Sequence, residues 1–582
     1  MSRGFESLVL RHFSFQKYLF KKTLNARLFN VKIKLDLSMK YKLALFVIII
    51  LTIIANFKII KKDPLLIFDD QVVVSKIEKI KNFNDYYDQY KIGNIYDIQP
   101  IRDFTYFIDF TIKRNLNLST HHAQNVFWWI ICFYIFFKLL ILQIKNEKLI
   151  IIVTSLYAFH PTIMNTVSWV AARKHLLSTA FILLATYFFL KNISKMTSRK
   201  NILFIIFLFL LSCLSQPINI LWPIWVLYYA FENNELSDQV NKILYLKLLI
   251  PLFFILVIIG FSNYEYYATT FAQQAGFSKF TSGDTNSIGL KILLLSRYFI
   301  QALVPYWSTP TSYYQGSIVN LYGLIPMVGV GYIAYKNRSA KIFNWIIFSI
   351  LPLLVVSLRA TNVFGSDTYT PIFIAGIFIF FSKCIDNLNY NFTCRSKIII
   401  SLISILLVMA FFVKSTFNIH QWIEYKSLID WAYRIEPSPQ NLKEKISISL
   451  KEGRSIDAYK YSLRLIQWDR FGKDTDKLFG LSLLQVPNLK AEDRENTFKL
   501  EIAKNPNSAW LPYCLAHFYH ANGQSTLACN ILRDIDIEKF QQFEQSINLV
   551  LESYKSFCQK DDLSNLERIE IIREKMKFAI PK

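Results

Sequence analysis

Long apolar segments recur from residue 41 to about residue 413, and they restrict the possible folds more than any other feature of the chain. An α-helix of about 20 residues crosses the ~30 Å hydrocarbon core of a bilayer. The first segment, residues 43–60, contains only three polar side chains. Backbone groups in hydrocarbon must be hydrogen-bonded within the segment, as a helix allows. We therefore expect an all-α fold that begins with a polytopic membrane domain.

The composition supports this class and divides the chain. Of its 582 residues, 53% are hydrophobic and 50 are Phe. After about residue 415 the sequence becomes polar and charged. We expect a basic cytoplasmic segment at 1–40, a membrane domain at 41–415 with an outer loop at 63–121, and a soluble extracytoplasmic helical domain at 416–582.

The net charge of +24 agrees with membrane insertion rather than nucleic-acid binding. The first forty residues contain nine Lys or Arg and two acidic residues. Basic residues beside apolar segments mark the cytoplasmic side and associate with anionic lipid. No recognisable nucleic-acid-binding motif accompanies these basic residues. We therefore expect the lipid bilayer, and no nucleic acid, as a partner.

The same charge rule predicts about eleven transmembrane helices. Residues 290–303 decide the count, because they include Lys291, Arg297 and Gln301. The last two share one face of a helix at four-residue spacing. We interpret this segment as a helix in the outer membrane surface, not as a span. The C-terminal domain then lies on the outer side.

The C-terminal domain shows a weak repeat. Residues 505–535 predict a helix–turn–helix whose spacing is close to a tetratricopeptide repeat. Residues 437–465 are similar, with Gly453 at the turn. Degenerate tetratricopeptide-like repeats and an ordinary helical bundle both remain open.

The seven cysteines do not form a recognisable disulfide framework. Three of them, Cys514, Cys529 and Cys558, belong to the C-terminal domain. Cys514 and Cys529 lie on successive predicted helices and are able to pair, whereas free buried thiols are the alternative. No Walker motif is found, so ATP-driven transport has no support in the chain.

Two adjacent carboxylates, Asp69 and Asp70, follow the first apolar segment. Acidic side chains are costly inside a bilayer, so we place them at the membrane face. One interpretation is a turn in a solvated loop, where Asp is common. The other is a catalytic pair facing the outer side.

Several sequence segments favour the catalytic interpretation, because together they resemble one family. The chain resembles the transmembrane and tetratricopeptide-repeat O-mannosyltransferases and their bacterial relatives, which have the GT-C membrane fold. The segments are LLIFDD at 65–70, HAQNVFWW at 122–129, the histidine segment at 158–190, LSQPINILWP at 214–223, SDTYTPIF at 366–373, and WIEYKSLIDWAYRIEPSP at 422–439.

The resemblance implies a glycosyltransferase that moves a sugar from a polyprenyl-phosphate donor to a hydroxyl of an exported protein or glycan. Asp69 or Asp70 would act as general base. The donor phosphate would be held by four basic residues, namely Arg102, His160, Arg173 and Lys174. Neither a metal nor a cofactor is expected. A bacterial inner membrane is expected, with the active face and the C-terminal domain in the periplasm; an endoplasmic-reticulum relative would have the same topology.

Three of these residues also have structural interpretations. Arg173 and Lys174 flank an apolar segment and are able to snorkel to the membrane surface. His160 precedes Pro161 and is able to cap a helix.

The chain also departs from the family pattern at several positions. Gln99 and Thr368 stand where the family usually has Arg, and Gln216 where it usually has Lys. Asn165 replaces a customary Glu, and His175 a customary Asp. These changes keep a second hypothesis open, a non-catalytic membrane scaffold whose outer helical domain binds a protein partner. A transporter is the third, but no span shows the paired acidic and basic residues of a substrate path.

Overall fold

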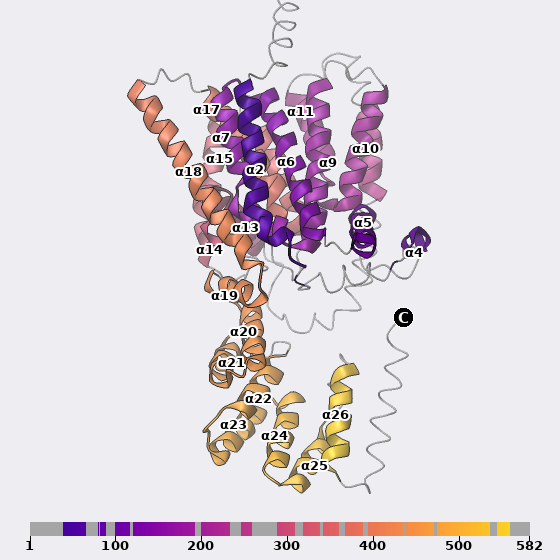
Figure 1. Cartoon of the computed structure of the whole chain (residues 1–582), viewed down its shortest axis with the longest axis vertical. Coiled ribbons are helices and arrows are strands. Elements are labelled where there is room, and N and C mark those ends of the chain that lie inside the picture. Colours follow the sequence, from indigo (N-terminus) through magenta and orange to yellow (C-terminus); the bar gives the residue numbers. More distant parts are fainter. Residues whose placement is uncertain are drawn as a thin grey trace, which may run out of the picture. The chain divides into compact units, whose positions relative to one another are not determined.

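The chain is all-helical in the part that the structure describes, where no strand occurs (Figure 1). This computed structural model describes residues 39–63, 65, 80, 82–88, 99–116, 120–192, 199–232, 246–258, 288–308, 318–337, 342–359, 367–387, 394–435, 437–470, 474–535 and 544–558. These residues divide into two compact units, one ending at Glu424 and the other beginning at Tyr425.

The first unit is a helical bundle. Its longer helices are α2 (Met39–Ile60), α5 (Pro100–Leu116), α6 (His121–Gln143), α7 (Glu147–Ala158), α9 (Arg173–Asn192), α10 (Arg199–Ser215), α11 (Trp222–Glu232), α13 (Ile288–Leu303), α15 (Leu324–Lys336), α16 (Asn344–Arg359), α17 (Thr370–Asn387) and α18 (Cys394–Gln421). Shorter elements are α4 (Phe83–Asp88), α8 (Pro161–Ser168), α14 (Ile318–Tyr322), η1 (Val170–Ala172), η3 (Pro217–Asn219), η5 (Pro305–Trp307) and η7 (Asp367–Tyr369). A further apolar helix covers Leu246–Ile258.

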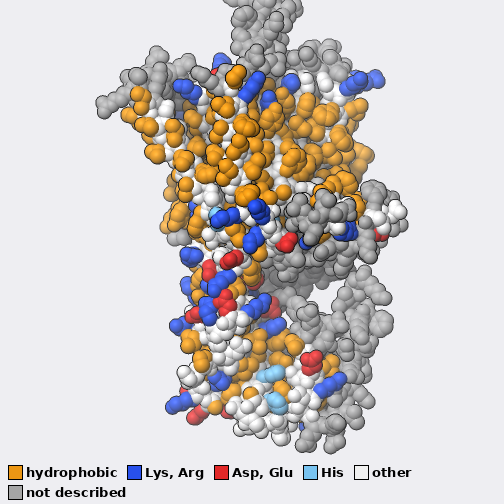
Figure 2. All heavy atoms as spheres, in the orientation of Figure 1, with side chains coloured by type: hydrophobic (Ala, Val, Ile, Leu, Met, Phe, Trp, Pro, Cys, Tyr) orange, Lys and Arg blue, Asp and Glu red, His pale blue; other side chains and the backbone are white. Residues whose placement is uncertain are grey.

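Several of these helices are able to span a membrane. Among the described residues, four helices are long and apolar enough: Tyr41–Ile60, His121–Gln143, Asp367–Asn387 and Ile398–Gln421. A fifth span results if α7 and α8, which meet at a 48° bend, count as one. Figure 2 shows hydrophobic side chains covering the middle of this unit, with Lys and Arg toward its rims. A multi-pass membrane protein is consistent with this. The count of eleven stays a prediction, because helices such as α10 and α16 have only 17 and 16 residues.

The bend between α7 and α8 comes from Pro161. Proline lacks an N–H and is well placed at the start of a helix. His160, the residue before it, has φ −72° and ψ 117°, the extended backbone that a following proline favours. The helix therefore stops at Ala158 and restarts at Pro161.

Helix α13 differs from the expectation of a surface helix. Arg297 and Gln301 do share a face, but both are fully buried. Arg297 donates to Asn320 Oδ1 (3.3 Å) and Gln301 to the carboxylate of Asp367 (2.9 Å). Hydrogen-bonded partners offset the desolvation of these polar groups, so the face packs inward instead of facing the membrane surface.

The second unit consists of α19 (Tyr425–Ile435), α20 (Pro439–Lys451), α21 (Ser455–Asp469), α22 (Thr475–Gln485), α23 (Ala491–Lys504), α24 (Trp510–Ala521), α25 (Ser525–Asp534) and α26 (Glu544–Phe557). Helices α20, α22 and α24 start 36 and 35 residues apart. The turns after α20 and α24 contain Gly453 (φ 69°) and Gly523 (φ 78°), in the left-handed conformation that glycine tolerates best.

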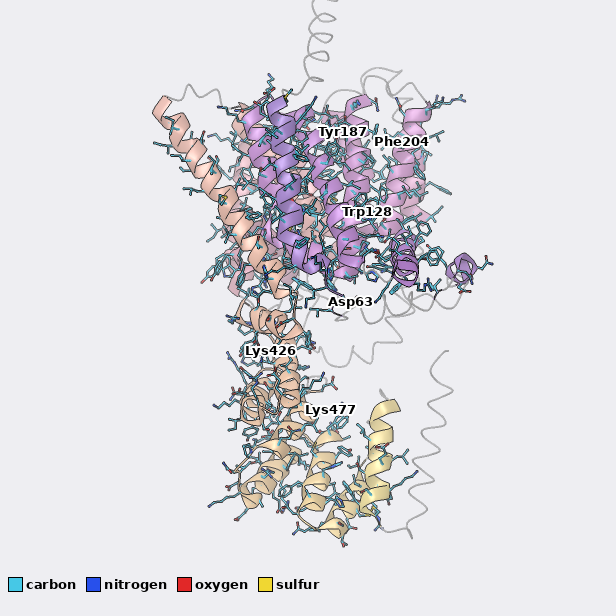
Figure 3. All side chains as sticks on the ribbon, in the orientation of Figure 1. Asp63, Trp128, Tyr187, Phe204, Lys426 and Lys477 are labelled. Atoms are coloured by element: carbon cyan, nitrogen blue, oxygen red, sulfur yellow. A yellow bond between two sulfur atoms is a disulfide. The ribbon has the colours of Figure 1, made fainter. Side chains whose placement is uncertain are left out.

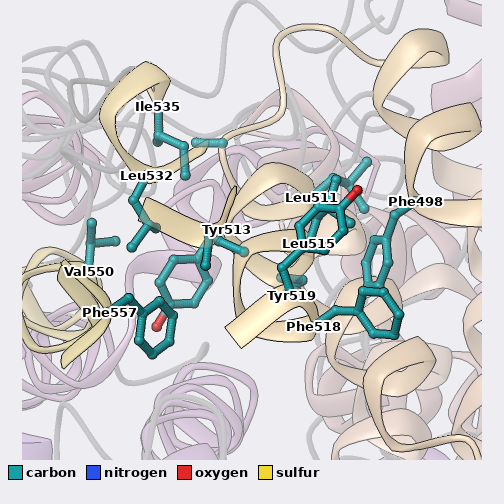
Figure 4. Close-up of a cluster of buried hydrophobic side chains, with 14 of the residues drawn as sticks. Phe498, Leu511, Tyr513, Leu515, Phe518, Tyr519, Leu532, Ile535, Val550 and Phe557 are labelled. Atoms are coloured by element: carbon teal, nitrogen blue, oxygen red, sulfur yellow. The ribbon is translucent and has the colours of Figure 1, made fainter. Parts of the chain in front are cut away.

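A hydrophobic core joins the later helices of this unit. Phe498, Leu515 and Phe518 lie on its α23–α24 side, and Tyr513, Val550 and Phe557 on the side of α26 (Figure 4). Gly480 of α22 allows close packing here, because a Cβ atom would lie 2.6 Å from Cys514 Sγ. Cys514 is accordingly a buried free thiol.

Cys529 forms its disulfide with Cys558, and not with Cys514. The Cα atoms of Cys529 and Cys558 are 5.2 Å apart. The pairing with Cys514 that the sequence left open is therefore wrong, and the alternative of free buried thiols holds for Cys514 but not for Cys529. Cys558 immediately follows α26, which packs against α25. This packing brings the thiol of Cys558 to Cys529.

Candidate functional site

Buried polar side chains form three clusters in the first unit, and residues 160–175 contribute to two of them and meet the third through Thr105. This segment contains α8, η1 and the first turn of α9. The clusters are defined by Asp109, by Gln99 with Gln216, and by Asp367. Each cluster joins residues that are far apart in the chain, so none was visible as a local motif.

The first cluster is an ion pair between Asp109 of α5 and Arg173 of α9. Asp109 Oδ2 lies 2.6 Å from Arg173 Nη1 and 2.9 Å from Nδ1 of His121. Thr120 donates its hydroxyl to Asp109 Oδ1 at 2.5 Å. The Asp109 and Arg173 side chains are both fully buried. Water therefore does not screen these two charges, and each charge is compensated by the other.

The remaining guanidinium atoms of Arg173 also meet protein partners. Nε donates to Asn125 Oδ1 (2.8 Å), and Nη2 to the carbonyl oxygen of His121 (2.8 Å). The guanidinium carbon stacks 4.4 Å from the ring centre of Tyr106. Arg173 thus ties α5, α6 and α9 together.

The charge state of Asp109 follows from these neighbours. Burial raises the pKa of its carboxyl, but the charge of Arg173 and the polar hydrogens of His121 and Thr120 lower it by more. The pKa of Asp109 therefore lies below its usual range. The carboxyl is ionised at neutral pH, as its ion pair requires.

The second cluster brings Gln99 and Gln216 together. Gln99 precedes α5 and Gln216 follows α10, yet Gln99 Nε2 donates to Gln216 Oε1 at 2.5 Å. Arg102 donates to Gln99 Oε1 (2.7 Å) and pairs with Asp103 (2.6 Å). Thr105 connects this cluster to the first, because its hydroxyl donates to Arg102 O and accepts from Arg173.

The third cluster surrounds the buried carboxylate of Asp367 in η7. Asn165 of α8 donates to Asp367 Oδ2 at 2.7 Å, and Gln301 of α13 donates to Oδ1 at 2.9 Å. The indole N–H of Trp422 donates to Asn165 Oδ1 at 3.4 Å. His175 packs edge-on against Tyr369 of the same turn, with ring centres 4.8 Å apart.

The structure distributes the predicted phosphate-binding residues over different surroundings. Arg102 belongs to the second cluster and Arg173 to the first. Lys174 follows Arg173 and is half-buried. His160 is fully buried, and its Nε2 lies 3.2 Å from the carbonyl oxygen of Ala302, while its side chain makes no capping hydrogen bond to α8. Their role toward a phosphate stays a prediction.

The predicted catalytic pair, Asp69 and Asp70, lies outside the described residues. The nearest described carboxylate before it is Asp63, three residues after the end of α2. Asp63 Oδ1 lies 3.6 Å from Lys113 Nζ of α5. Figure 3 shows Asp63 at the end of the bundle where α5 lies, with Tyr187 toward the opposite end. The chain therefore leaves α2 beside the helix that carries Asp109 and Arg102.

Sequence reasoning missed Asp109 and His121 as members of the site, and it included Asn125 and Asp367 only within the segments 122–129 and 366–373, without a role. Their residue type could have indicated the site. Each is a polar residue within or beside an apolar segment, where a polar side chain needs a hydrogen-bonding or charged partner. No group of three or more His, Cys, Asp or Glu side chains suited to a metal ion is found in the described part of the chain.

Comparison with known proteins gives no relative. No protein-family model, no curated protein and no solved structure matches the chain.

Proposed function

We propose that this protein is a membrane glycosyltransferase that moves a sugar from a polyprenyl-phosphate donor to a hydroxyl of an exported protein or glycan. One observation carries the proposal. Segments that resemble the O-mannosyltransferase family lie as much as 300 residues apart, and four of them each contact the histidine segment at residues 158–190.

The contacts are specific. In HAQNVFWW, Asn125 donates to the carbonyl oxygens of Val167 and Trp169. In LSQPINILWP, the carbonyl oxygen of Gln216 accepts from Ser178 at 2.9 Å. Asp367 of SDTYTPIF and Trp422 of the last segment both bond Asn165. Contacts of four segments with the histidine segment are what a common site would require.

The proposed reaction needs a base and an anion site. Asp69 or Asp70 takes the proton of the acceptor hydroxyl, whose oxygen bonds to the anomeric carbon of the sugar. The bond between that carbon and the donor phosphate breaks, and the polyprenyl phosphate leaves with the electron pair. Arg102 and Lys174 are the basic residues that we assign to the leaving phosphate. The position of Asp63 beside α5 supports a base on this side of the bundle.

We also propose that the second unit is tetratricopeptide-like and lies in the periplasm of a bacterial inner membrane. The 36- and 35-residue spacing of α20, α22 and α24 is close to the 34 residues of that repeat. The Cys529–Cys558 disulfide favours an oxidising compartment. Such a unit would bind the acceptor protein.

The deciding experiment is intact-mass spectrometry of exported proteins from three strains. One strain makes the wild-type protein, one lacks the protein, and one makes the double variant Asp69→Asn/Asp70→Asn. A hexose-sized mass should disappear equally in the deletion and the double variant. Asp63→Asn is the matched control, because Asp63 is an exposed carboxylate at the same end of the bundle and should leave the mass in place. Unchanged masses in the deletion strain would reject the transferase.

The Gln99–Gln216 pair favours a second candidate, the non-catalytic scaffold whose outer helical domain binds a protein partner. Two neutral amides that bond each other occupy positions where the family usually has Arg and Lys. The cluster thus has less positive charge for a phosphate. If the double Asn variant restores every phenotype of the deletion, the scaffold is the better explanation.

A further inference from the structure

Helix α16 contains a proline at an interior position, Pro352. Proline has no backbone N–H, so the carbonyl oxygen of Phe348, one turn earlier, lacks the donor that the helical pattern would supply. Among apolar helices, such a carbonyl group needs a partner from a neighbouring helix or from an ordered water molecule. The surroundings of Pro352 therefore decide how this break in α16 is satisfied.

A small cavity lies beside the break, where α9, η3, α11, α16 and α17 meet. Phe348 and Pro352 both line it, together with Trp222 and Trp225 of α11. Among the described residues that line the cavity, Asn219 of η3 is the only one with a polar side chain apart from these two indoles. The cavity has room for about one water molecule.

The hydrogen bonds around Asn219 fix the orientation of its side-chain amide. The hydroxyl of Ser178 donates to the carbonyl oxygen of Gln216 (2.9 Å), and that of Ser212 donates to the carbonyl oxygen of Ser178 (2.9 Å). Both hydroxyl hydrogens are then in use, so the group that meets the two serines must be a donor. Asn219 Nδ2 accordingly lies 2.9 Å from Ser178 Oγ and 3.3 Å from Ser212 Oγ.

The amide oxygen of Asn219 is left for the cavity. Asn219 is only 2% exposed, and its Oδ1 accepts no hydrogen bond from the described part of the chain. The indole N–H of Trp222 donates instead to Thr186 Oγ1 (3.1 Å). That of Trp225 donates to the carbonyl oxygen of Asn344 (2.9 Å). A buried acceptor without a donor is unfavourable, so the cavity favours a guest that donates hydrogen bonds.

We propose that this cavity binds one ordered water molecule, which donates one hydrogen bond to Asn219 Oδ1 and the other to the carbonyl oxygen of Phe348. Water fits because it is small enough and carries two donors for the two acceptors. Through Asn219 and Ser178, which holds the carbonyl oxygen of Gln216, the water connects the second polar cluster to the break in α16. The proposal concerns the packing of the first unit and does not depend on transferase activity.

The first test is X-ray hydroxyl-radical footprinting of the full chain in detergent, read by peptide mass spectrometry. X-rays split a bound water molecule, and the resulting radical oxidises the side chains that contact it. Trp225 should be oxidised several-fold faster than Trp129. Both indoles are fully buried and donate to a carbonyl oxygen, but of the two only Trp225 lines the cavity. Equal oxidation rates of the two tryptophans would overturn the proposal.

Two substitutions in the same assay test the two hydrogen bonds of the water. Pro352→Ala supplies an N–H to the carbonyl oxygen of Phe348, and Asn219→Leu removes the other acceptor. Each should lower the oxidation rate of Trp225 several-fold. Pro305→Ala is the matched control and should leave this rate unchanged, because Pro305 starts the short helix η5, where an N–H has no helical acceptor. Alanine favours a helix, so an unchanged rate in Pro352→Ala would contradict the water bridge without a loss of fold.

A density map of the full chain, at a resolution that shows ordered water, is the second test. A single peak within about 3 Å of both Asn219 Oδ1 and the carbonyl oxygen of Phe348 supports the proposal. Continuous density for a lipid acyl chain overturns it, and so does a cavity without density.

Discussion

At the scale of single residues, the buried polar groups of the first unit are more informative than the apolar ones. Arg173 was expected to hold a lipid phosphate or to snorkel, and the structure shows it inside the protein against Asp109. Arg297 was expected at the membrane surface and is buried as well. In both cases the sequence showed a charge in an apolar segment but not its partner, which comes from another helix.

The Asp109–Arg173 pair leads to a stability prediction. Asp109→Asn should lower the free energy of unfolding by about 3–5 kcal/mol, because it leaves the buried charge of Arg173 without its counter-ion. Thermal unfolding of the detergent-solubilised chain measures the change. The control is Asp63→Asn, whose exposed pair with Lys113 should contribute at most about 1 kcal/mol. Equal effects of the two variants would show that Asp109 is not part of a buried ion pair.

At the scale of elements, close helix packing depends on a few small residues. Gly376 of α17 faces α16, and a Cβ atom there would lie 2.1 Å from Ser349 Oγ and 3.0 Å from the carbonyl oxygen of Trp345. Such a contact requires the two helices to separate. The apolar pattern of both helices could be seen in the sequence, but the partner of each could not.

Gly376→Ala should therefore destabilise the first unit by about 1–3 kcal/mol, the usual cost of overpacking. Gly329→Ala in α15 is the control, since a Cβ atom there meets no atom within 4 Å and alanine favours a helix. The midpoint of thermal unfolding should fall for the first variant and stay level or rise for the second. If the midpoint fell for Gly329→Ala and not for Gly376→Ala, the described α16–α17 contact would be contradicted.

At the scale of the whole molecule, the Cys529–Cys558 bond tests the compartment of the second unit. If this unit is periplasmic, protein denatured without reductant should leave these two cysteines unlabelled by a maleimide. Cells that lack periplasmic disulfide formation should yield protein with both labelled. Cys514 is the internal control, because it is a free thiol and should label after denaturation in either strain. Labelling of all three in normal cells would place the unit on the reducing side.

The sequence by itself determined the helical class, the presence of several membrane-competent helices and a polar C-terminal region. These properties follow from composition and from hydrophobic length, which are local. Only the tertiary structure decided that Gln99 meets Gln216, that Asn165 meets Asp367, and that Cys529 pairs with Cys558 instead of Cys514. Each of these depends on which helices pack together. Apolar helix surfaces resemble one another too closely for a single sequence to specify their partners.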